Sequence, residues 1–160
     1  MQPASLDVFT APEIQLVYKS ALKDAERPRV ISASEAFAVL FKTWDENTID
    51  LVEQFKVLLL NQRKKVLGIY EHSSGGTMQT VIDRRLVFAA ALKANALSMI
   101  LAHNHPSGDC QPSRADILLT DELTAAGKLL GIDVLDHLIV TRDAYYSIAN
   151  QQAYRLIPEQ

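Results

Sequence analysis

The sequence has one cysteine and no long hydrophobic run. Cys110 has no second cysteine with which to form an intramolecular disulfide. No apolar segment approaches the roughly 18 residues that a transmembrane helix needs, and residues 1–7 show neither the basic start nor the apolar centre of a signal peptide. We therefore expect a cytoplasmic protein with no membrane partner.

The sequence also lacks a large excess of either positive or negative charge. The 16 Lys and Arg residues against 19 Asp and Glu residues give a formal net charge of −3. This balance creates no overall attraction to polyanions, which disfavours a dedicated nucleic-acid-binding protein. The 160 residues, of which 48% are hydrophobic, suffice for one domain with a substantial core, and they contain no internal repeat.

Hydrophobic periodicity predicts an α/β (α+β) fold, a mixed sheet with flanking helices. Ser32 and Glu35 form a capping box before the first helix, and Gly131 ends the third. The strands are expected over 13–19, 53–61, 66–70, 96–102, 132–141 and 145–148, and the helices over about 32–44, 83–95 and 113–130.

The polar connector 45–50 is the expected boundary between two parts of the chain. Residues 1–50 would form an N-terminal extension, a strand plus a helix, that packs on or precedes the core. Residues 51–150 would form the main domain, and 151–160 a C-terminal tail. Between the strands 53–61 and 66–70 we expect a hairpin turn, and around 73–77 a flexible loop.

Two histidines and an aspartate form a candidate metal site. His103 and His105 follow an apolar strand, where the period of two points both imidazoles to one face. A turn over 106–109 then leads to a helix whose first turn carries Asp116. Two imidazoles and one carboxylate leave a fourth tetrahedral position for water, which is typical of a catalytic zinc site.

Ordinary structural roles compete with these assignments. Ser113-x-x-Asp116 is also a helix-capping pattern, and two histidines at a strand end can simply be hydrogen-bonded. His137 and the adjacent Asp136 could support a ligand or be buried polar residues of the core. Cys110 is conceivable as a fourth ligand, although it would close the site to water.

The pattern His103-x-His105-Pro106, followed by Ser113 and Asp116, resembles the JAMM (MPN+) motif of zinc isopeptidases and peptidases. The sequence of residues 103–116, together with a second block near residues 130–140, resembles that of the RadC family of bacterial JAB-domain proteins. The resemblance extends from about residue 53 to about residue 147. The resemblance implies an MPN/JAB domain with a cytidine-deaminase-like mixed sheet, a Zn²⁺ ion and a peptide or protein substrate.

The resemblance also implies roles for single residues. His103, His105 and Asp116 would hold the zinc ion. A catalytic glutamate stands at the start of a strand that reads Glu-x-Phe-x-Val-Leu, and Glu53 fits this place. Ser113 would stabilise the oxyanion or hold the attacking water. Three other carboxylates in the neighbourhood are alternative candidates for this glutamate: Glu46, Asp50 and Glu71.

Other functions remain open at this point. The repair-related name of the RadC family suggests a DNA-associated accessory protein, but residues 1–50 show no Gly-x-Gly hairpin and no basic stripe, and Arg84-Arg85 is a weak phosphate signal. A catalytically silent MPN scaffold is a third reading. A nucleotide deaminase would need Pro-Cys-x-x-Cys, which is absent, whereas an iron facial triad would use the same ligand types.

Overall fold

The structure, a computed structural model, describes residues 18–74 and 81–156. No helix in these residues is both long and apolar enough to cross a membrane. The elements are η1 (Asp24–Glu26), α1 (Ala33–Phe41), β1 (Gln54–Leu60), β2 (Val66–Ser74), α2 (Arg84–Lys93), β3 (Ser98–Asn104), α3 (Arg114–Leu130), β4 (Asp133–Val140), β5 (Ala144–Ser147) and β6 (Gln152–Arg155).

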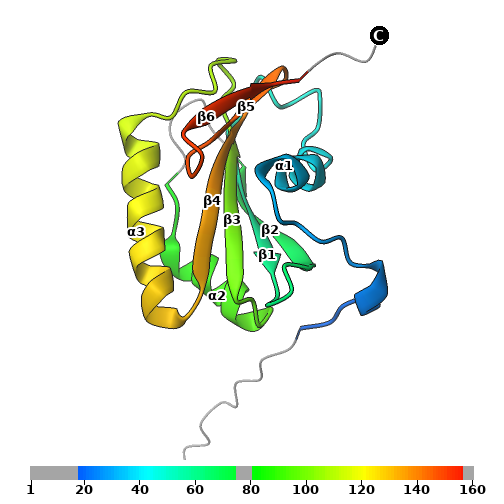
Figure 1. Cartoon of the computed structure of the whole chain (residues 1–160). Coiled ribbons are helices and arrows are strands. Elements are labelled where there is room, and N and C mark those ends of the chain that lie inside the picture. Colours follow the sequence, from blue (N-terminus) through cyan, green and yellow to red (C-terminus); the bar gives the residue numbers. More distant parts are fainter. Residues whose placement is uncertain (1–17, 75–80, 157–160) are drawn as a thin grey trace, which may run out of the picture.

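The strands form one mixed sheet in the order β2-β1-β3-β4-β5-β6. Among the strands of the described residues only β3 and β4 pair in parallel, and helix α3 is the crossover that connects them. Helices α2 and α3 cover one face of the sheet, and α1 covers the other (Figure 1). This arrangement confirms the predicted α/β class, a mixed sheet with flanking helices.

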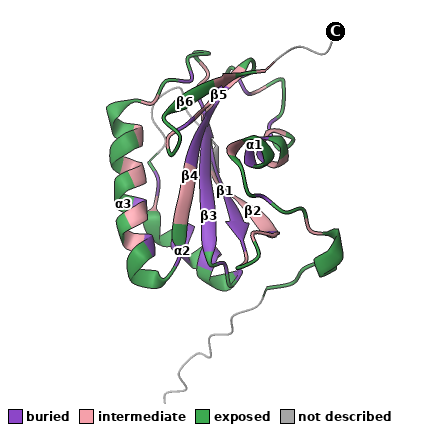
Figure 2. Ribbon diagram, viewed as in Figure 1, coloured by how far each residue is buried: buried purple, intermediate pink, exposed green. Residues whose placement is uncertain are grey.

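The central strand β3 is buried along its whole length (Figure 2). Its side chains alternate between the two faces. Met99 and Leu101 pack in the cluster beneath α2 and α3, whereas Ile100 and Ala102 pack in the cluster beneath α1. The same alternation places the side chain of His103 on the α3 side of the sheet.

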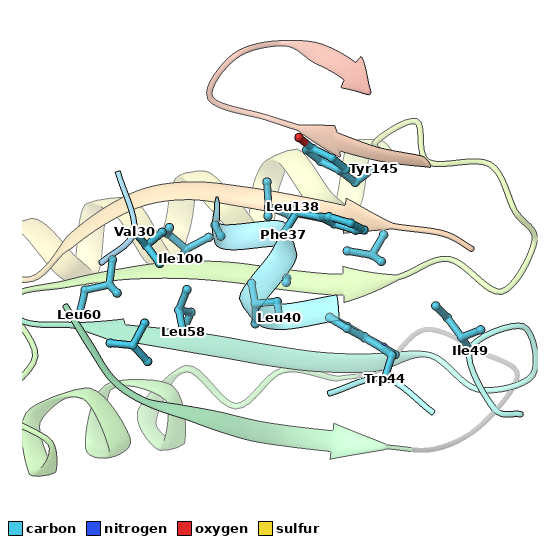
Figure 3. Packing of buried hydrophobic residues seen from close by; sticks show 14 residues of the cluster. Val30, Phe37, Leu40, Trp44, Ile49, Leu58, Leu60, Ile100, Leu138 and Tyr145 are labelled. Carbon is cyan, nitrogen blue, oxygen red and sulfur yellow. The ribbon is translucent and has the colours of Figure 1, made fainter. Parts of the chain in front are cut away.

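Helix α1 is fixed to the sheet by its apolar face. Phe37 and Leu40 pack against Leu58 and Leu138 from the strands (Figure 3). The predicted capping box begins the helix: the backbone N–H of Glu35 donates to the Ser32 hydroxyl, and the Ser32 N–H donates to the Glu35 carboxylate. A helix from the expected N-terminal extension thus shares a core with the strands of the main domain.

Some elements differ from the sequence expectations. Of the strand expected over 13–19, residues 13–17 lie outside the described residues, and 18–19 are not in a strand. Strand β2 continues to Ser74, into the expected loop. Residues 152–155, expected in a tail, form the edge strand β6; its mostly exposed residues carry no alternating apolar pattern, and pairing with β5 holds it in place.

Asn104 ties the end of β3 to the segment before β1. Its side-chain oxygen accepts hydrogen bonds from the Trp44 indole N–H (3.0 Å) and the Gln54 backbone N–H (2.8 Å). Its amide nitrogen donates to the carbonyls of Ile49 (2.7 Å) and Val52 (2.8 Å). Because the group is fully buried and all four bonds are made, Asn104 fixes the backbone on both sides of Glu53.

We expect Asn104→Asp to lower the free energy of unfolding by at least about 2 kcal/mol, because it removes both donors to buried carbonyls and adds a buried charge. Urea unfolding measures the change. The same substitution at the exposed Asn95 is the control and should cost less than about 1 kcal/mol. Equal losses in the two variants would contradict the anchoring role of Asn104.

Candidate metal centre

The three predicted ligands converge at the end of β3 and the start of α3. The Nε2 atoms of His103 and His105 are 2.9 Å apart. Asp116 Oδ1 lies 3.2 Å from His103 Nε2, and Asp116 Oδ2 lies 3.4 Å from His105 Nε2. One donor atom from each residue lies within 4.8 Å of the others, so the group could hold a metal ion.

The turn after β3 orients His105. Gly108 adopts a φ of +83°, which favours glycine, and its N–H donates to the carbonyl of His105 (3.0 Å). The chain therefore folds back, and the carbonyl of Asp109 lies 2.8 Å from His105 Nδ1. A proton on Nδ1 satisfies this carbonyl and leaves the Nε2 lone pair directed at the other two ligands.

Asp116 serves as a cap residue and as a member of the site at once. Its Oδ2 accepts hydrogen bonds from the Ser113 backbone N–H and hydroxyl, each at 2.7 Å, and its own N–H donates back to that hydroxyl (3.2 Å). The capping interpretation and the metal interpretation are therefore compatible. In this arrangement Ser113 orients the carboxylate, and its hydroxyl hydrogen points to Asp116.

The three side chains shift one another's proton affinities. Burial by itself raises the pKa of Asp116, but hydrogen bonds with His103 and His105 outweigh it and hold that pKa well below its usual range. Burial by itself lowers the pKa of His105, but the bonds with Asp116 and Asp109 leave it above the ordinary value of 6.5. The carboxylate is thus ionised at neutral pH, as a metal ligand must be.

His137, whose role the sequence left open, lies directly behind His103. Its Nε2 is 2.8 Å from His103 Nδ1, and its Nδ1 is 2.6 Å from the hydroxyl of Thr120. The ring is completely buried, and burial together with the charge of His103 lowers its pKa well below the ordinary value. Sequence reasoning missed Thr120, although its position four residues after Asp116 places both on one helix face.

Glu53 shares a cavity of about 260 Å³ with His103 and Asp116. The antiparallel pairing of β1 with β3 sets Phe55 opposite His103, so the half-buried Glu53, two residues earlier, approaches His105 and helps to raise its pKa. The rest of the lining is mostly apolar: Phe55, Val81, Ile82, Arg84, Ala115 and Leu119.

Two of the other candidate carboxylates are engaged elsewhere. Asp50 accepts hydrogen bonds from Arg142 (2.9 and 2.7 Å), and Glu71 forms an ion pair with Lys56 (3.3 Å). Glu46 is exposed and does not line the cavity. Among the carboxylates considered around β1, Glu53 is therefore the one that the fold brings to the ligands.

The remaining polar residues singled out from the sequence lie outside the ligand set. Cys110 is buried, but it does not belong to the group that could hold a metal. Asp136 accepts hydrogen bonds from the N–H groups of His137 and Ala149 and from the Ser147 hydroxyl, which connects β4 to β5 and the chain after it. Its contacts are those of a residue that holds the fold together.

Comparison with known proteins yields a consistent set of relatives named UPF0758 protein. That of Flavobacterium johnsoniae is 39% identical over 123 residues, covering 77% of this chain and 52% of that protein. That of Methanosarcina acetivorans is 33% identical over 146 residues, covering 88% and 62%. That of Alkaliphilus metalliredigens is 46% identical over 96 residues, covering 60% and 41%. The chain spans about half the length of these curated relatives.

A family model described as the RadC-like JAB domain matches residues 30–153. The match covers most of the chain, including α1, the strands β1 to β5 and all three residues of the candidate metal centre. It agrees with the mixed sheet, its helices and the resemblance noted in the sequence. The chain belongs to the RadC-like JAB domain family.

Proposed function

We propose that the protein is a zinc-dependent peptidase or isopeptidase-like hydrolase of the JAMM type, in which a metal-activated water attacks an amide carbonyl. One observation carries the proposal: His103, His105 and Asp116 converge beside a cavity that also holds Glu53. A Lewis-acid site and a separate carboxylate in one cavity are what hydrolysis of an amide requires.

The spacing of the three donor atoms fits a zinc ion. Bonds of about 2.0–2.1 Å in tetrahedral geometry set neighbouring ligand atoms roughly 3.3 Å apart. The Nε2 atoms of His103 and His105 are 2.9 Å apart, and Asp116 places Oδ1 3.2 Å from the first and Oδ2 3.4 Å from the second, so contacts of about this length are available to either carboxylate oxygen. The set contains two nitrogens and one oxygen, so it suits zinc and leaves one position for water; iron(II) uses the same ligand types and must be separated by metal analysis.

Bound zinc would act as a Lewis acid and lower the pKa of a coordinated water to about 7. Glu53 would take a proton from the attacking water and return it to the leaving amine nitrogen. General acid–base catalysis of this kind contributes about 10²- to 10⁴-fold in rate. The half-buried place of Glu53 in the cavity supports this role, because a proton shuttle must reach both the water and the leaving group.

Ser113 has two proposed tasks that compete for one hydrogen. Its hydroxyl donates to Asp116, and to stabilise an oxyanion it would have to rotate away from that carboxylate. The Ser113 backbone N–H would still hold Asp116 in place (2.7 Å). We therefore propose that Ser113 orients Asp116 in the resting site and donates to the oxyanion or the attacking water during catalysis.

The alternative of a DNA-associated accessory protein draws no support from the two arginines at the start of α2. Arg84 pairs with Glu122, and Arg85 pairs with Asp83. A catalytically silent scaffold is disfavoured because all five motif residues are present and four of them are assembled around the cavity or the ligand set. Hydrolysis remains the function that the site supports best.

Purified protein should carry close to one zinc ion per chain. His103→Ala should lose the metal, because it removes one of three ligands, and inductively coupled plasma mass spectrometry measures the content. His72→Ala is the control: His72 accepts a hydrogen bond from the Asp83 backbone and does not belong to the ligand group. A carefully prepared wild-type protein without zinc would count against the proposal, as would iron in its place.

Glu53→Gln should keep the metal and lose about 10²- to 10⁴-fold in turnover, because the amide cannot shuttle protons. Mass spectrometry of a peptide pool that includes lysine-linked isopeptides would detect the new termini. Glu46→Gln changes a nearby exposed carboxylate and should leave cleavage intact. Cleavage that survives Glu53→Gln, or that persists in His103→Ala, would rule out this mechanism.

Zinc affinity should fall on acidification. His105 must be neutral to bind zinc. Burial lowers its pKa, but the hydrogen bonds with Asp116 and Asp109 and the charges of Asp116 and Glu53 together outweigh burial and raise that pKa above 6.5 in the metal-free protein. Protons should therefore begin to compete with zinc above that pH, and the loss should approach about tenfold per pH unit for each histidine that titrates. Chelator competition at several pH values measures the slope. An affinity that stays constant or rises on acidification would contradict this site.

A further inference from the structure

A continuous chain of polar contacts runs behind the metal centre. It leads from His103 Nδ1 to His137 Nε2 (2.8 Å) and from His137 Nδ1 to the Thr120 hydroxyl (2.6 Å). The Thr120 hydroxyl then donates to the backbone carbonyl of Asp116 (2.6 Å). The chain therefore begins at one candidate ligand and ends on the backbone of another.

The chemistry of these groups allows only one arrangement of protons once a metal binds. If His103 offers its Nε2 lone pair to the metal, its proton must sit on Nδ1, so His137 must accept at Nε2. The remaining proton of His137 is then on Nδ1 and is donated to Thr120, whose own hydrogen goes to the Asp116 carbonyl. Each donor meets one acceptor, and a doubly protonated His137 would set two donors against each other.

We propose that His137 and Thr120 are positioning residues of the metal centre, which hold His103 in the tautomer and ring orientation that direct Nε2 to the metal. This inference rests on the proposed metal site. The groups that hold a metal-bound histidine through its other nitrogen tune both its orientation and its basicity, and their loss typically weakens metal binding by about 10- to 100-fold.

Burial strengthens the effect of these hydrogen bonds on the orientation of His103. His137 is fully buried and His103 nearly so, and the ring of Phe55 packs against both, with centroids 5.8 and 6.3 Å away. Water cannot readily replace a bond lost there, so the proton left on His137 would be unsatisfied. A histidine buried only for packing would not have to keep a particular tautomer, and this difference can be tested.

Thr120→Val keeps the size of the side chain and removes the hydroxyl. We expect it to weaken zinc binding by about 10- to 100-fold in a chelator competition, whereas Thr120→Ser should restore affinity to within about threefold of wild type. Thr124→Val is the matched control. Thr124, one turn later on α3, makes the same bond to the carbonyl four residues earlier (2.7 Å), but the described contacts do not link it to His137. Equal zinc affinity in Thr120→Val and Thr124→Val would overturn the inference.

A second measurement needs no variant. In the zinc-loaded protein, nitrogen-15 NMR of the histidine rings should show His137 protonated on Nδ1 and not on Nε2, with the same tautomer for His103. A proton on Nε2 of His137 would refute the proposed positioning role of His137 and Thr120. A wild-type protein that binds no zinc would instead contradict the proposed function itself. The failure of the proposed function can therefore be distinguished from the failure of the positioning role.

Discussion

The alternation of side chains along the buried strand β3 is the constraint on which the site depends. Since successive residues face opposite sides of the sheet, His103 emerges towards α3, and Asn104 emerges towards α1. The first reaches the carboxylate of Asp116, and the second anchors the backbone around Glu53. A shift of one residue in the pairing of β3 would turn each of these side chains to the opposite face of the sheet. The geometry of the site therefore depends on the register of this strand.

The site is also held by hydrogen bonds that each of the three residues makes with a neighbouring group. His105 is tied to the carbonyl of Asp109, Asp116 to Ser113, and His103 to His137. The bond between His103 and His137 lies in the buried interior, where it would be costly to leave unmade. The bonds of the two ligand histidines use Nδ1 and so leave both Nε2 atoms facing Asp116. The polar groups around the centre therefore preorganise the ligands, and the capping box at the start of α3 serves folding and the site together.

Spacing alone was enough to predict that His103, His105 and Asp116 come together as a candidate metal site, because a strand end, a tight turn and a helix start are local patterns. Glu53 needed the family resemblance, since its approach to His103 comes from the long-range pairing of β1 with β3. His137 stayed ambiguous for the same reason: only the parallel pairing of β3 and β4 shows which face it takes. Thr120 was missed, and so was strand β6, whose residues are mostly exposed and ordered by pairing with β5.

A crystal structure of the zinc-loaded protein, with anomalous data collected at the zinc edge, tests the central claim most directly. We predict one anomalous peak about 2.0–2.2 Å from Nε2 of His103, Nε2 of His105 and a carboxylate oxygen of Asp116, with water at the fourth position within reach of Glu53. A peak ligated by Cys110, a peak at other residues, or no peak with zinc present would contradict the account.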